Sequence, residues 1–439
     1  MMIIIADDLT GANDSGVQLS KQGLKTLVYI DPLNWQDDSQ SNNLFKGDVL
    51  VIDTETRELS GEEAAEASRK ITAKLRLDQQ KNATFYKKID STLRGNIGKE
   101  LEVLMDFLDK DLCILAPSFP GNNRLTVGGY LLVNNEPLGL SQYYQGGLDP
   151  WQGSYIPDYI QQQTDLPVGL VELKDVMQGE KVIFKQIEAL QKKGKKIIVF
   201  DAALDSQLRD IVNSSKRLNS SILYCGSAGL ANHFSSLNSS KREDDYLISS
   251  DKKPILMVVG TRNKVMEEQI KYLSRNLLVS YLKIDLLDIF GDKKGSLKSY
   301  TSKALAALEG EKHLIIHPDP DFNQQEAADE ILQAREISFR GLETKIRDFL
   351  AELTANILAE AEIRDLFVTG GDTAIGICNK LGIKSLLIRE EILPGIPLSS
   401  PENSKYQRLR LVTKAGGFGG EETLYKIVSK LSTNREVKV

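Results

Sequence analysis

The chain has 439 residues, of which 41% are hydrophobic and 26% are charged, and its formal net charge at pH 7 is −6. This length exceeds what one hydrophobic core usually supports, so we expect two domains. The acidic balance leaves no basic excess to neutralise a nucleic-acid backbone, which argues against a nucleic-acid partner.

Cysteine and histidine usage narrows the class of protein further. The three cysteines, Cys113, Cys225 and Cys378, are too widely spaced for a disulfide framework or a metal motif, and the three histidines are scattered. The apolar start at 2–5 is too short for a signal peptide, and no apolar run reaches the roughly 20 residues that span a bilayer. We therefore expect a cytoplasmic protein without a metal site built by its own side chains.

In the first half, short apolar runs alternate with longer amphipathic stretches, as in β-α-β units around a parallel sheet. The segment 118–153 is rich in turn formers and predicts a loop and hairpin that project over a site. The expected strands are 2–6, 26–30, 49–53, 84–88, 113–116 and 197–201, and the expected helices are 14–22, 61–75, 97–108 and 182–192.

A polar stretch between 234 and 254 predicts the domain boundary. We expect a first domain at 1–236, a linker at 237–253 and a second domain at 254–439. A second α/β alternation follows the linker, with strands at 255–259, 279–284, 313–317, 366–369, 385–388 and 408–413, and helices at 264–275, 295–308, 342–360, 374–381 and 421–431. The pattern predicts an α/β fold of two domains, each with a mostly parallel sheet flanked by helices, and an active site in the crevice between them.

Carboxylates follow the first predicted strand. Because neighbouring strand residues point to opposite sides, one of Asp7 and Asp8 is expected to face the crevice, and Asp14 follows one turn later. A carboxylate there could accept the proton of an attacking hydroxyl or hold a sugar hydroxyl. The alternative is that Asp7 or Asp8 only caps the following helix.

A second polar cluster, 87–96, ends the strand at 84–88. Arg94 could pair with a substrate carboxylate through two hydrogen bonds, Lys88 and Ser91 could assist, and Asp90 could bind hydroxyls. The alternative is a solvated loop with a surface pair between Asp90 and Arg94. Arg57, after the third strand, is either a second carboxylate clamp or an ordinary surface arginine.

Two glycine clusters end strands of the second half, at 369–374 and 414–420. Glycine turns at strand ends that open helices expose backbone N–H groups to anions, so two such turns predict a polyphosphate cradle, with Lys414 as a point charge. Neither cluster is a P-loop, and no dinucleotide fingerprint follows the first strand. The alternative is two tight turns, with Asp372 acting as a helix N-cap.

These motifs, taken in order, resemble the four-carbon acid sugar kinase family, whose members have an N-terminal sugar-acid-binding domain and a C-terminal nucleotide-binding domain. The similarity spans nearly the whole chain, at 5–16, 88–95, 116–135, 226–231, 369–376 and 414–420. It implies a phosphotransferase with an alcohol acceptor, which uses ATP and Mg²⁺ to phosphorylate the terminal hydroxyl of threonate, erythronate or 3-oxo-tetronate. The run Asp-Asp-Leu-Thr-Gly-Ala-Asn-Asp at 7–14 looks closer to the threonate and erythronate branch.

The resemblance also implies site residues. Substrate contacts would fall on Asp8, Arg57 and 88–91, and nucleotide contacts on the second domain's glycine turns. The chain departs from the family pattern after the strand at 255–259, where Thr261 keeps a hydroxyl and Met266 loses one. The expected nucleotide-binding residues are Gly260, Thr261, Gly370, Gly371, Asp372, Thr373, Lys414, Gly416, Gly417 and Gly419.

The resulting hypothesis is an ATP-dependent kinase of the 4-hydroxyl of D-threonate or D-erythronate. Arg94 would hold the substrate carboxylate with help from Arg57 and Lys88. The hydroxyls would contact the remaining polar residues of that loop, Asp90 and Ser91. Asp8 is the expected general base and Asp14 the reserve, and Asp372 would stand in the outer shell of Mg²⁺.

Other functions stay open at this point. The alternative acid is 3-oxo-tetronate, and the residues do not fix the stereochemistry or the number of identical subunits. Two further classes are a sensor that binds sugar acid and nucleotide without turnover, and an NAD-dependent dehydrogenase. The missing glycine fingerprint argues against the dehydrogenase, and the intact Asp8, Arg94 and Asp372 argue against the sensor.

Overall fold

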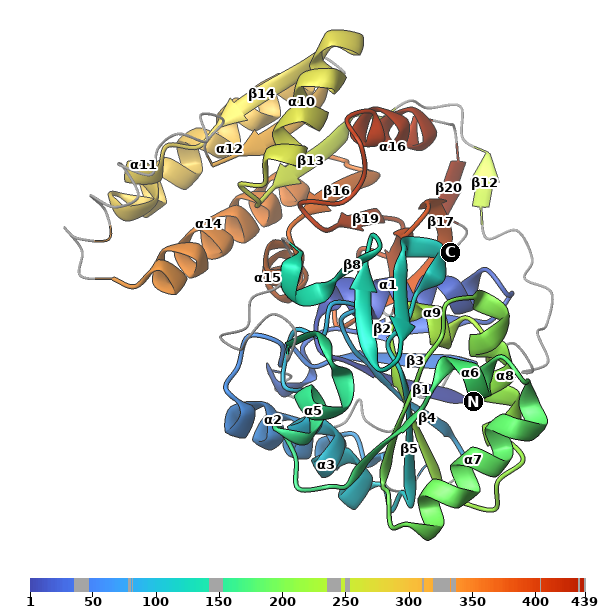
Figure 1. Cartoon of the computed structure of the whole chain (residues 1–439). Helices are drawn as coiled ribbons and strands as arrows, with labels where there is room; N and C mark the ends of the chain where they lie inside the picture. The colour runs from blue at the N-terminus through green and yellow to red at the C-terminus, as the bar shows by residue number, and fades with distance from the viewer. Residues whose placement is uncertain are drawn as a thin grey trace. The chain divides into compact units, whose positions relative to one another are not determined.

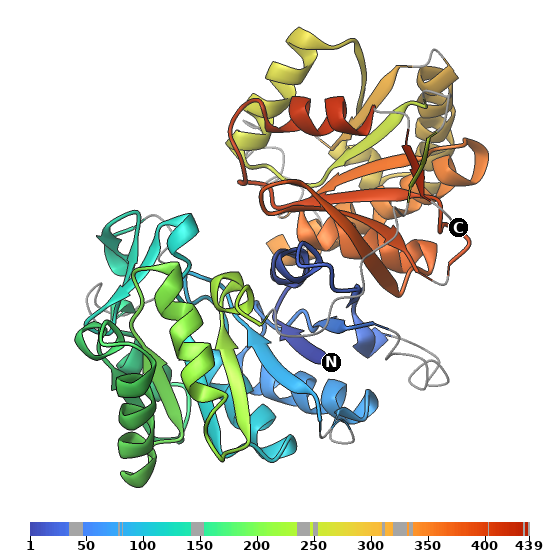
Figure 2. The same cartoon turned by 90° about the vertical axis from the view of Figure 1, so that its right-hand side faces the viewer.

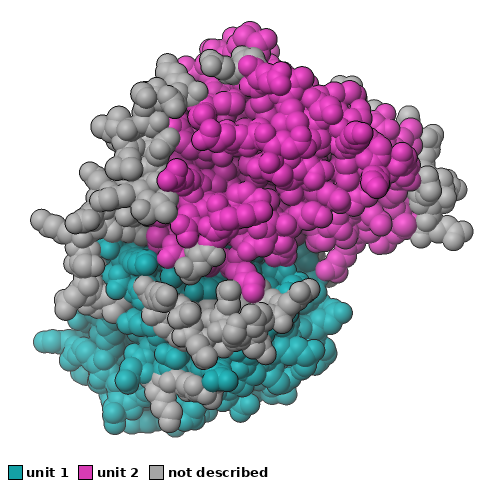
Figure 3. All heavy atoms as spheres, turned by 180° about the vertical axis from the view of Figure 1, so that it is seen from behind, with its two compact units in different colours: residues 1–241 teal, residues 242–439 magenta. Residues whose placement is uncertain are grey.

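The computed structural model divides the chain into two compact units, Met1–Lys241 and Arg242–Val439 (Figure 3). The predicted linker at 237–253 lies mostly outside the described residues. The residues described are 1–34, 47–77, 80, 82–141, 153–234, 246–248, 253–309, 312–318, 332, 337–402, 404–432 and 435–437.

Unit 1 is built on a parallel sheet in the order β2-β3-β1-β4-β11-β5-β10-β9. Helices cover both faces: α1, α8 and α9 pack together on one, and α2, α3 and α5 on the other (Figure 1). The strands are β1 (Met2–Ala6), β2 (Thr26–Tyr29), β3 (Val49–Asp53), β4 (Thr84–Lys88), β5 (Leu112–Ala116), β9 (Val168–Val171), β10 (Ile197–Phe200) and β11 (Ile222–Gly226). The helices are α1 (Leu9–Ser20), α2 (Gly61–Lys74), α3 (Ile97–Phe107), α5 (Ile156–Gln161), α6 (Leu173–Val176), α7 (Glu180–Lys192), α8 (Asp205–Ser215) and α9 (Ala228–Ala231).

The strands of unit 2 follow the order β14-β15-β13-β16-β19-β18-β17. The first five strands are parallel, whereas β18 runs antiparallel to both β17 and β19. Helices α10 and α16 pack on one face, and α12, α14 and α15 on the other (Figure 2). The strands are β13 (Ile255–Val259), β14 (Val279–Lys283), β15 (His313–His317), β16 (Asp365–Thr369), β17 (Ser385–Leu393), β18 (Ile396–Pro401) and β19 (Arg410–Lys414), and a separate pair joins β12 (Tyr246–Ile248) to β20 (Arg435–Val437). The helices are α10 (Lys264–Asn276), α11 (Leu286–Phe290), α12 (Lys293–Glu309), α14 (Phe339–Glu360), α15 (Gly371–Leu381) and α16 (Thr423–Leu431).

The expected α/β class and most strands are confirmed, but one boundary near the site is wrong. The helix predicted at 14–22 begins at Leu9, because the Asp8 side chain accepts a hydrogen bond from the Gly11 N–H and caps it. The periodicity of this helix is weak, since Gly11 and Gly16 stand among its buried positions. The prediction also missed β9, β11 and β18.

The predicted hairpin is present as β6 (Arg124–Val127) and β7 (Tyr130–Val133), extended by β8 (Glu136–Pro137). Its turn is tied to the main sheet because both oxygens of Asp201, after β10, accept backbone hydrogen bonds from Gly128 and Gly129. Leu173 donates a third. Among the described helices, none combines the length and the apolar composition needed to cross a bilayer.

Each sheet reverses its strand order at one point. In unit 1 the chain moves from β1 outward to β2 and β3, then crosses to β4 on the other side. In unit 2 it moves from β13 to β14 and β15, then crosses to β16. The loops after the two central strands therefore diverge at the carboxyl edge, which is where open α/β sheets bind ligands.

Candidate active site

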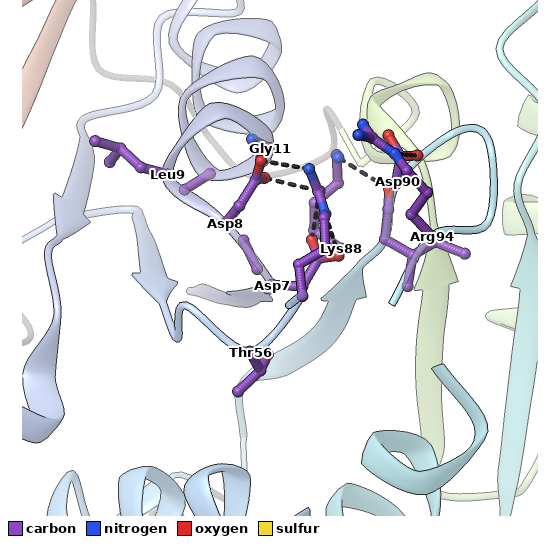
Figure 4. A network of polar contacts seen from close by, with 12 residues as sticks. Asp7, Asp8, Leu9, Gly11, Thr56, Lys88, Asp90 and Arg94 are labelled. Carbon is purple, nitrogen blue, oxygen red and sulfur yellow. Dashed lines mark hydrogen bonds and ion pairs between the residues drawn. The ribbon is translucent and has the colours of Figure 1, made fainter. Parts of the chain in front are cut away.

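The acidic and basic residues predicted in unit 1 gather at its reversal point. Asp7 and Asp8 follow β1, and Lys88 ends the neighbouring strand β4 and leads to Asp90 and Arg94 (Figure 4). The register pairs Ala6 with Lys88, so the two loops leave the sheet side by side. We call Asp7, Asp8, Arg57, Lys88, Asp90 and Arg94 the acid-side cluster.

Asp8 is both a helix cap and an ion-pair partner. Its Oδ1 accepts from the Gly11 N–H at 2.7 Å and from Arg57 Nη2 at 2.8 Å, while its Oδ2 pairs with Arg57 Nη1. Burial raises the pKa of Asp8 from its ordinary value, the charge of Arg57 opposes that rise and the charge of Asp7 adds to it. The capping alternative is thus correct for Asp8, and it is compatible with a base of increased strength.

Arg57 is held by two carboxylates of unit 1, Asp7 and Asp8. Besides its contacts to Asp8, its Nε and Nη2 each donate to Asp7 at 2.9 Å. An arginine has five N–H donors, so at most one remains for a ligand. As a substrate clamp Arg57 therefore has little capacity, although its role in binding stays a prediction.

A buried ionic network supports the loop that carries Arg57. Glu100 Oε1 of α3 accepts from Lys87 Nζ at 2.7 Å and from Thr56 Oγ1 at 2.6 Å, with both charged side chains fully buried. The Thr56 N–H also donates to the Asp7 carbonyl. Because both ends of this loop are hydrogen-bonded to strands or helices, the position of Arg57 is set by the core.

The loop after β4 presents Arg94. Asp90 Oδ2 accepts from the hydroxyl of Thr92 and from Arg94 Nε, the latter at 2.8 Å. Burial would raise the pKa of Asp90, but the hydrogen bond from Arg94 and the charge of Arg57 outweigh it and hold that pKa below its usual range. Leu93 is buried with φ of +60°, a conformation costly for a bulky residue, and its carbonyl accepts from Tyr159 Oη.

Arg94 has more donors to offer than Arg57. Within the described residues it donates only from Nε, to Asp90, which leaves both terminal nitrogens, and its side chain is 40% exposed. Asp90 is similar, because among the described residues its hydrogen bonds fall on Oδ2 and none falls on Oδ1. The surface-pair alternative is correct about the contact itself, and Arg94 keeps both terminal nitrogens available to an anion.

Three further residues were predicted for the site in unit 1: Lys88, Ser91 and Asp14. Lys88 is buried, and its Nζ donates to the Ile89 carbonyl at 2.9 Å and lies beside Gly11. Ser91 is half-buried in the same turn. Asp14 lies inside α1, six residues after Asp8, which turns it about 240° around the helix axis. That placement gives no support to Asp14 as a reserve base.

In unit 2 the predicted glycine turns lie side by side. The strands before them, β16 and β19, are paired in parallel with Thr369 opposite Lys414. The Gly370 N–H donates to the Lys414 carbonyl, and the Gly260 N–H after β13 donates to the Thr369 carbonyl. Three strand ends therefore form one surface, which we call the glycine cradle: 260–263, 370–373 and 414–419.

The cradle is packed without space for larger residues. A Cβ atom on Gly416 would lie 2.2 Å from Thr261 Oγ1, and one on Gly417 would lie 2.8 Å from Asn263 Nδ2. Gly370 has φ of +101° and precedes α15, and no side chain of the described residues caps this helix, so its first N–H groups stay open within that part of the chain. Such N–H groups favour an anion such as phosphate.

Two details of the cradle differ from the sequence interpretation. Asp372 is not the N-cap, because Gly370 holds that position, and Asp372 is exposed in the first turn of α15. The turn after β19 does not open a helix directly, since α16 begins only at Thr423. Lys414 Nζ donates to the carbonyls of its own turn, at 2.8 Å to Ala415 and 2.9 Å to Phe418. It therefore organises the turn, and burial lowers its pKa to about 8.

The side chains near the two clusters bear on metal binding. Among the described residues, no group of three or more His, Cys, Asp and Glu side chains stands where it could hold a metal ion. Mg²⁺ often binds through one or two carboxylates together with the phosphates of its substrate. Asp372 fits this way of binding Mg²⁺, because its exposed carboxylate lies beside open N–H groups that suit a phosphate.

Two family models match the chain, one over each cluster's unit. Residues 2–234 match the model of a sugar-binding N-terminal domain, and residues 256–424 match that of a nucleotide-binding C-terminal domain. The chain is 32% identical over 426 residues to a D-threonate kinase of Salmonella typhimurium, covering 96% of both chains. The chain belongs to the four-carbon acid sugar kinase family. It is therefore a kinase, an enzyme that transfers a phosphoryl group to an alcohol.

Other relatives of the kinase share its length. A D-erythronate kinase of Heliobacterium modesticaldum is 27% identical, covering 98% of this chain and 97% of its own, and a 3-oxo-tetronate kinase of Cupriavidus necator is 27% identical, covering 95% and 94%. Solved structures from Haemophilus influenzae and Salmonella typhimurium align with TM-scores of 0.73 and 0.78. Each is 23% identical and covers at least 97% of both chains, which shows the shared fold.

Sequence reasoning missed two parts of the site. Asp7 was treated as one of two alternatives, but both Asp7 and Asp8 bind Arg57, because the strand ends at Ala6 and its alternation no longer applies. Asn263 was not singled out, although it caps α10 and contacts Gly417. The helix signal Asn-Lys-Val-Met-Glu-Glu after a strand could have identified it.

Proposed function

We propose that this kinase transfers the γ-phosphoryl group of ATP to the 4-hydroxyl of a four-carbon sugar acid, D-threonate or D-erythronate. The observation that carries the proposal is the full-length similarity to kinases with those names. The 7–14 run adds to it by its likeness to the threonate and erythronate branch. The first domain, 1–236, would hold the acid and the second, 254–439, the nucleotide.

Arg94 is the proposed carboxylate clamp. Its two open terminal nitrogens match the geometry of a carboxylate, and Asp90 fixes its direction through Nε. Lys88 adds charge nearby, whereas Arg57 contributes chiefly through Asp8. Asp90 Oδ1 and Ser91 would accept or donate hydrogen bonds at the substrate hydroxyls.

Asp8 is the proposed general base. Its side chain is 21% exposed, and its charge acts on Arg94, the proposed clamp. A base takes the proton of the attacking hydroxyl most effectively when its pKa lies above that of a free carboxyl. The raised pKa of Asp8 supports this role.

The glycine cradle is the proposed site for the phosphates of ATP. Its open N–H groups at α15 and its tight glycine contacts suit a polyphosphate. Mg²⁺ would neutralise charge on the transferred group, held by the phosphates with Asp372 in its outer shell. During turnover the acid-side cluster and the cradle would have to meet across the two substrates.

A panel assay tests the substrate. Purified enzyme, Mg²⁺ and ATP are incubated with D-threonate, D-erythronate, their L-isomers and 3-oxo-tetronate, and ADP release is followed by a coupled assay. We expect the highest kcat/KM with D-threonate or D-erythronate. A clear preference for 3-oxo-tetronate would replace the substrate, and binding of acid and ATP without ADP release would make the protein a sensor.

A further inference from the structure

Asp7 belongs to none of the roles assigned so far, yet it is the most buried carboxylate of the acid-side cluster. Its side chain is 2% exposed. Both of its oxygens accept from Arg57, Oδ2 from Nε and Oδ1 from Nη2, each at 2.9 Å. Its carbonyl accepts from the N–H groups of Thr56 and Arg57. Asp7 thus holds Arg57 through main chain and side chain together.

The hydrogen bonds to Asp7 determine which edge of the Arg57 guanidinium can bind Asp8. With Nε and one Nη2 proton directed to Asp7, the guanidinium can offer Asp8 only its outer edge, through Nη1 and Nη2. A planar fork fixed along one side has little freedom to rotate. The orientation of the Asp8 carboxylate is therefore set through Arg57 by a residue behind it.

Gly95 closes the same arrangement from the other loop. It has φ of +98°, and a Cβ atom there would lie 3.3 Å from Asp7 Oδ2 and 3.7 Å from the Arg57 Cα. The backbone that follows Arg94 thus packs directly on the Asp7–Arg57 pair. Asp7 contacts the supports of both the proposed base and the proposed clamp.

The charges around Asp8 come from several elements. If Arg57 paired with Asp8 alone, its positive charge would keep Asp8 ionised and make Asp8 a weak base. Because Arg57 also pairs with Asp7, Asp8 is more basic. The charged and titratable groups that face Asp8 are Asp7 and Arg57, Lys88 of β4, Asp53 of β3, Glu55 beside the start of α1, and Arg94.

We propose that Asp7 is a positioning residue for phosphoryl transfer, which fixes the Arg57 fork so that Asp8 is directed at the acceptor hydroxyl while sharing the guanidinium charge. The inference rests on the proposed function, in which Asp8 is the base. Asp7 itself touches neither substrate. It acts through Arg57.

The test is Asp7→Asn in the full-length enzyme, with kcat and KM measured across pH. We expect kcat to fall between about tenfold and 10²-fold, the scale of a misplaced catalytic group. The acidic limb of the kcat profile should move to lower pH, because a neighbouring negative charge that raises the pKa of Asp8 is lost. KM for ATP should stay the same. A purely structural role would lower the thermal midpoint and leave the acidic limb in place, which would overturn the proposal.

Three further variants keep the test decisive. Asp111→Asn removes an exposed carboxylate at the amino end of β5, and it should change neither kcat nor the limb. If Asp7→Asn does not fold, Asp7→Glu is the substitute. It keeps the charge but displaces the Arg57 fork, so kcat should fall while the acidic limb stays in place. A wild-type kcat in Asp7→Glu would overturn the proposal.

Asp8→Asn separates this inference from the proposed function, because loss of the base should lower kcat by about 10²-fold or more. If Asp8→Asn is inactive and Asp7→Asn is normal, only this inference fails; if Asp8→Asn is fully active, the proposed base fails.

Discussion

Gly260 and Thr373 approach so closely that a Cβ atom on Gly260 would lie 1.8 Å from Thr373 Oγ1 and 2.7 Å from its Cβ. Rotating the threonine does not relieve both contacts, so the strand end after β13 and the first turn of α15 are locked together. This close contact ties two of the three edges of the glycine cradle.

Gly260→Ala should therefore displace the cradle. We expect a loss of about 1–3 kcal/mol in unfolding free energy from overpacking, with a higher KM for ATP and an unchanged KM for the acid. Gly420→Ala is the matched control, because no atom of the residues that the structure describes lies within 4 Å of a Cβ atom there. Steady-state kinetics with each substrate varied in turn would check this; an equal rise in both KM values would mean that the cradle is not the nucleotide site.

Arg94→Ala should raise KM for the acid. Hydrogen bonds to charged groups contribute about 1.5–3 kcal/mol, which corresponds to about tenfold to 10²-fold. Arg94→Lys keeps the charge but loses the fork and should fall in between. Arg69→Ala removes an exposed arginine of α2 paired with Glu66 and serves as the control. An unaltered KM for the acid in Arg94→Ala would remove Arg94 as the clamp.

The buried side chain of Lys414 leads us to expect that ATP binding is coupled to the uptake of a proton. Burial lowers its pKa to about 8, so above that pH the side chain is neutral in the free enzyme. A bound triphosphate favours the ammonium form, so ATP binding should take up a proton above pH 8, and affinity should fall as pH rises through that value. Calorimetry at pH 8.5 in two buffers of different ionisation enthalpy measures the uptake. Lys414→Met should abolish it and Lys426→Met, an exposed lysine of α16, should not; uptake in both would place the proton elsewhere.

Asp53 predicts the pH dependence of stability. It is fully buried at the end of β3, and burial together with the neighbouring charge of Glu55 raises its pKa well above 3.8. The folded state therefore holds a proton that the unfolded chain releases, so stability falls as pH rises from about 4 to the folded pKa. Asp53→Asn should flatten this slope and match or exceed the wild type at pH 7, since an amide can replace the protonated carboxyl. Denaturant unfolding between pH 4 and 8 checks this; an unchanged slope would contradict it.

Much of the fold could be predicted, because buried strands such as 255–259 are continuous apolar runs bounded by turn formers. The two glycine turns could be located because each follows an apolar run of this kind. Their proximity could be predicted because parallel strands bring their carboxyl ends to one edge of a sheet. The start of α1 was not predicted, because its capping residue, Asp8, was assigned to catalysis. A carboxylate can do both, and sequence periodicity does not distinguish them.

The side-chain partnerships were harder to predict. Arg57 was open as a second carboxylate clamp or an ordinary surface arginine, but four of its five N–H donors bind Asp7 and Asp8, which lie about 50 residues away in the chain. Lys414 was expected as a point charge for phosphate, and the sequence did not indicate that its ammonium group also binds the carbonyls of its own turn. Such contacts depend on how loops fold back over the sheet, and spacing along the sequence does not record that.

Transfer of label tests the central claim most directly. The enzyme is incubated with ATP carrying ³²P at the γ position and with D-threonate or D-erythronate, and the products are separated and the site of phosphorylation is read by NMR. The account predicts one labelled 4-phosphomonoester of the acid for each ADP formed. Label that appears only as inorganic phosphate, or that stays in ATP with both substrates bound, would contradict it.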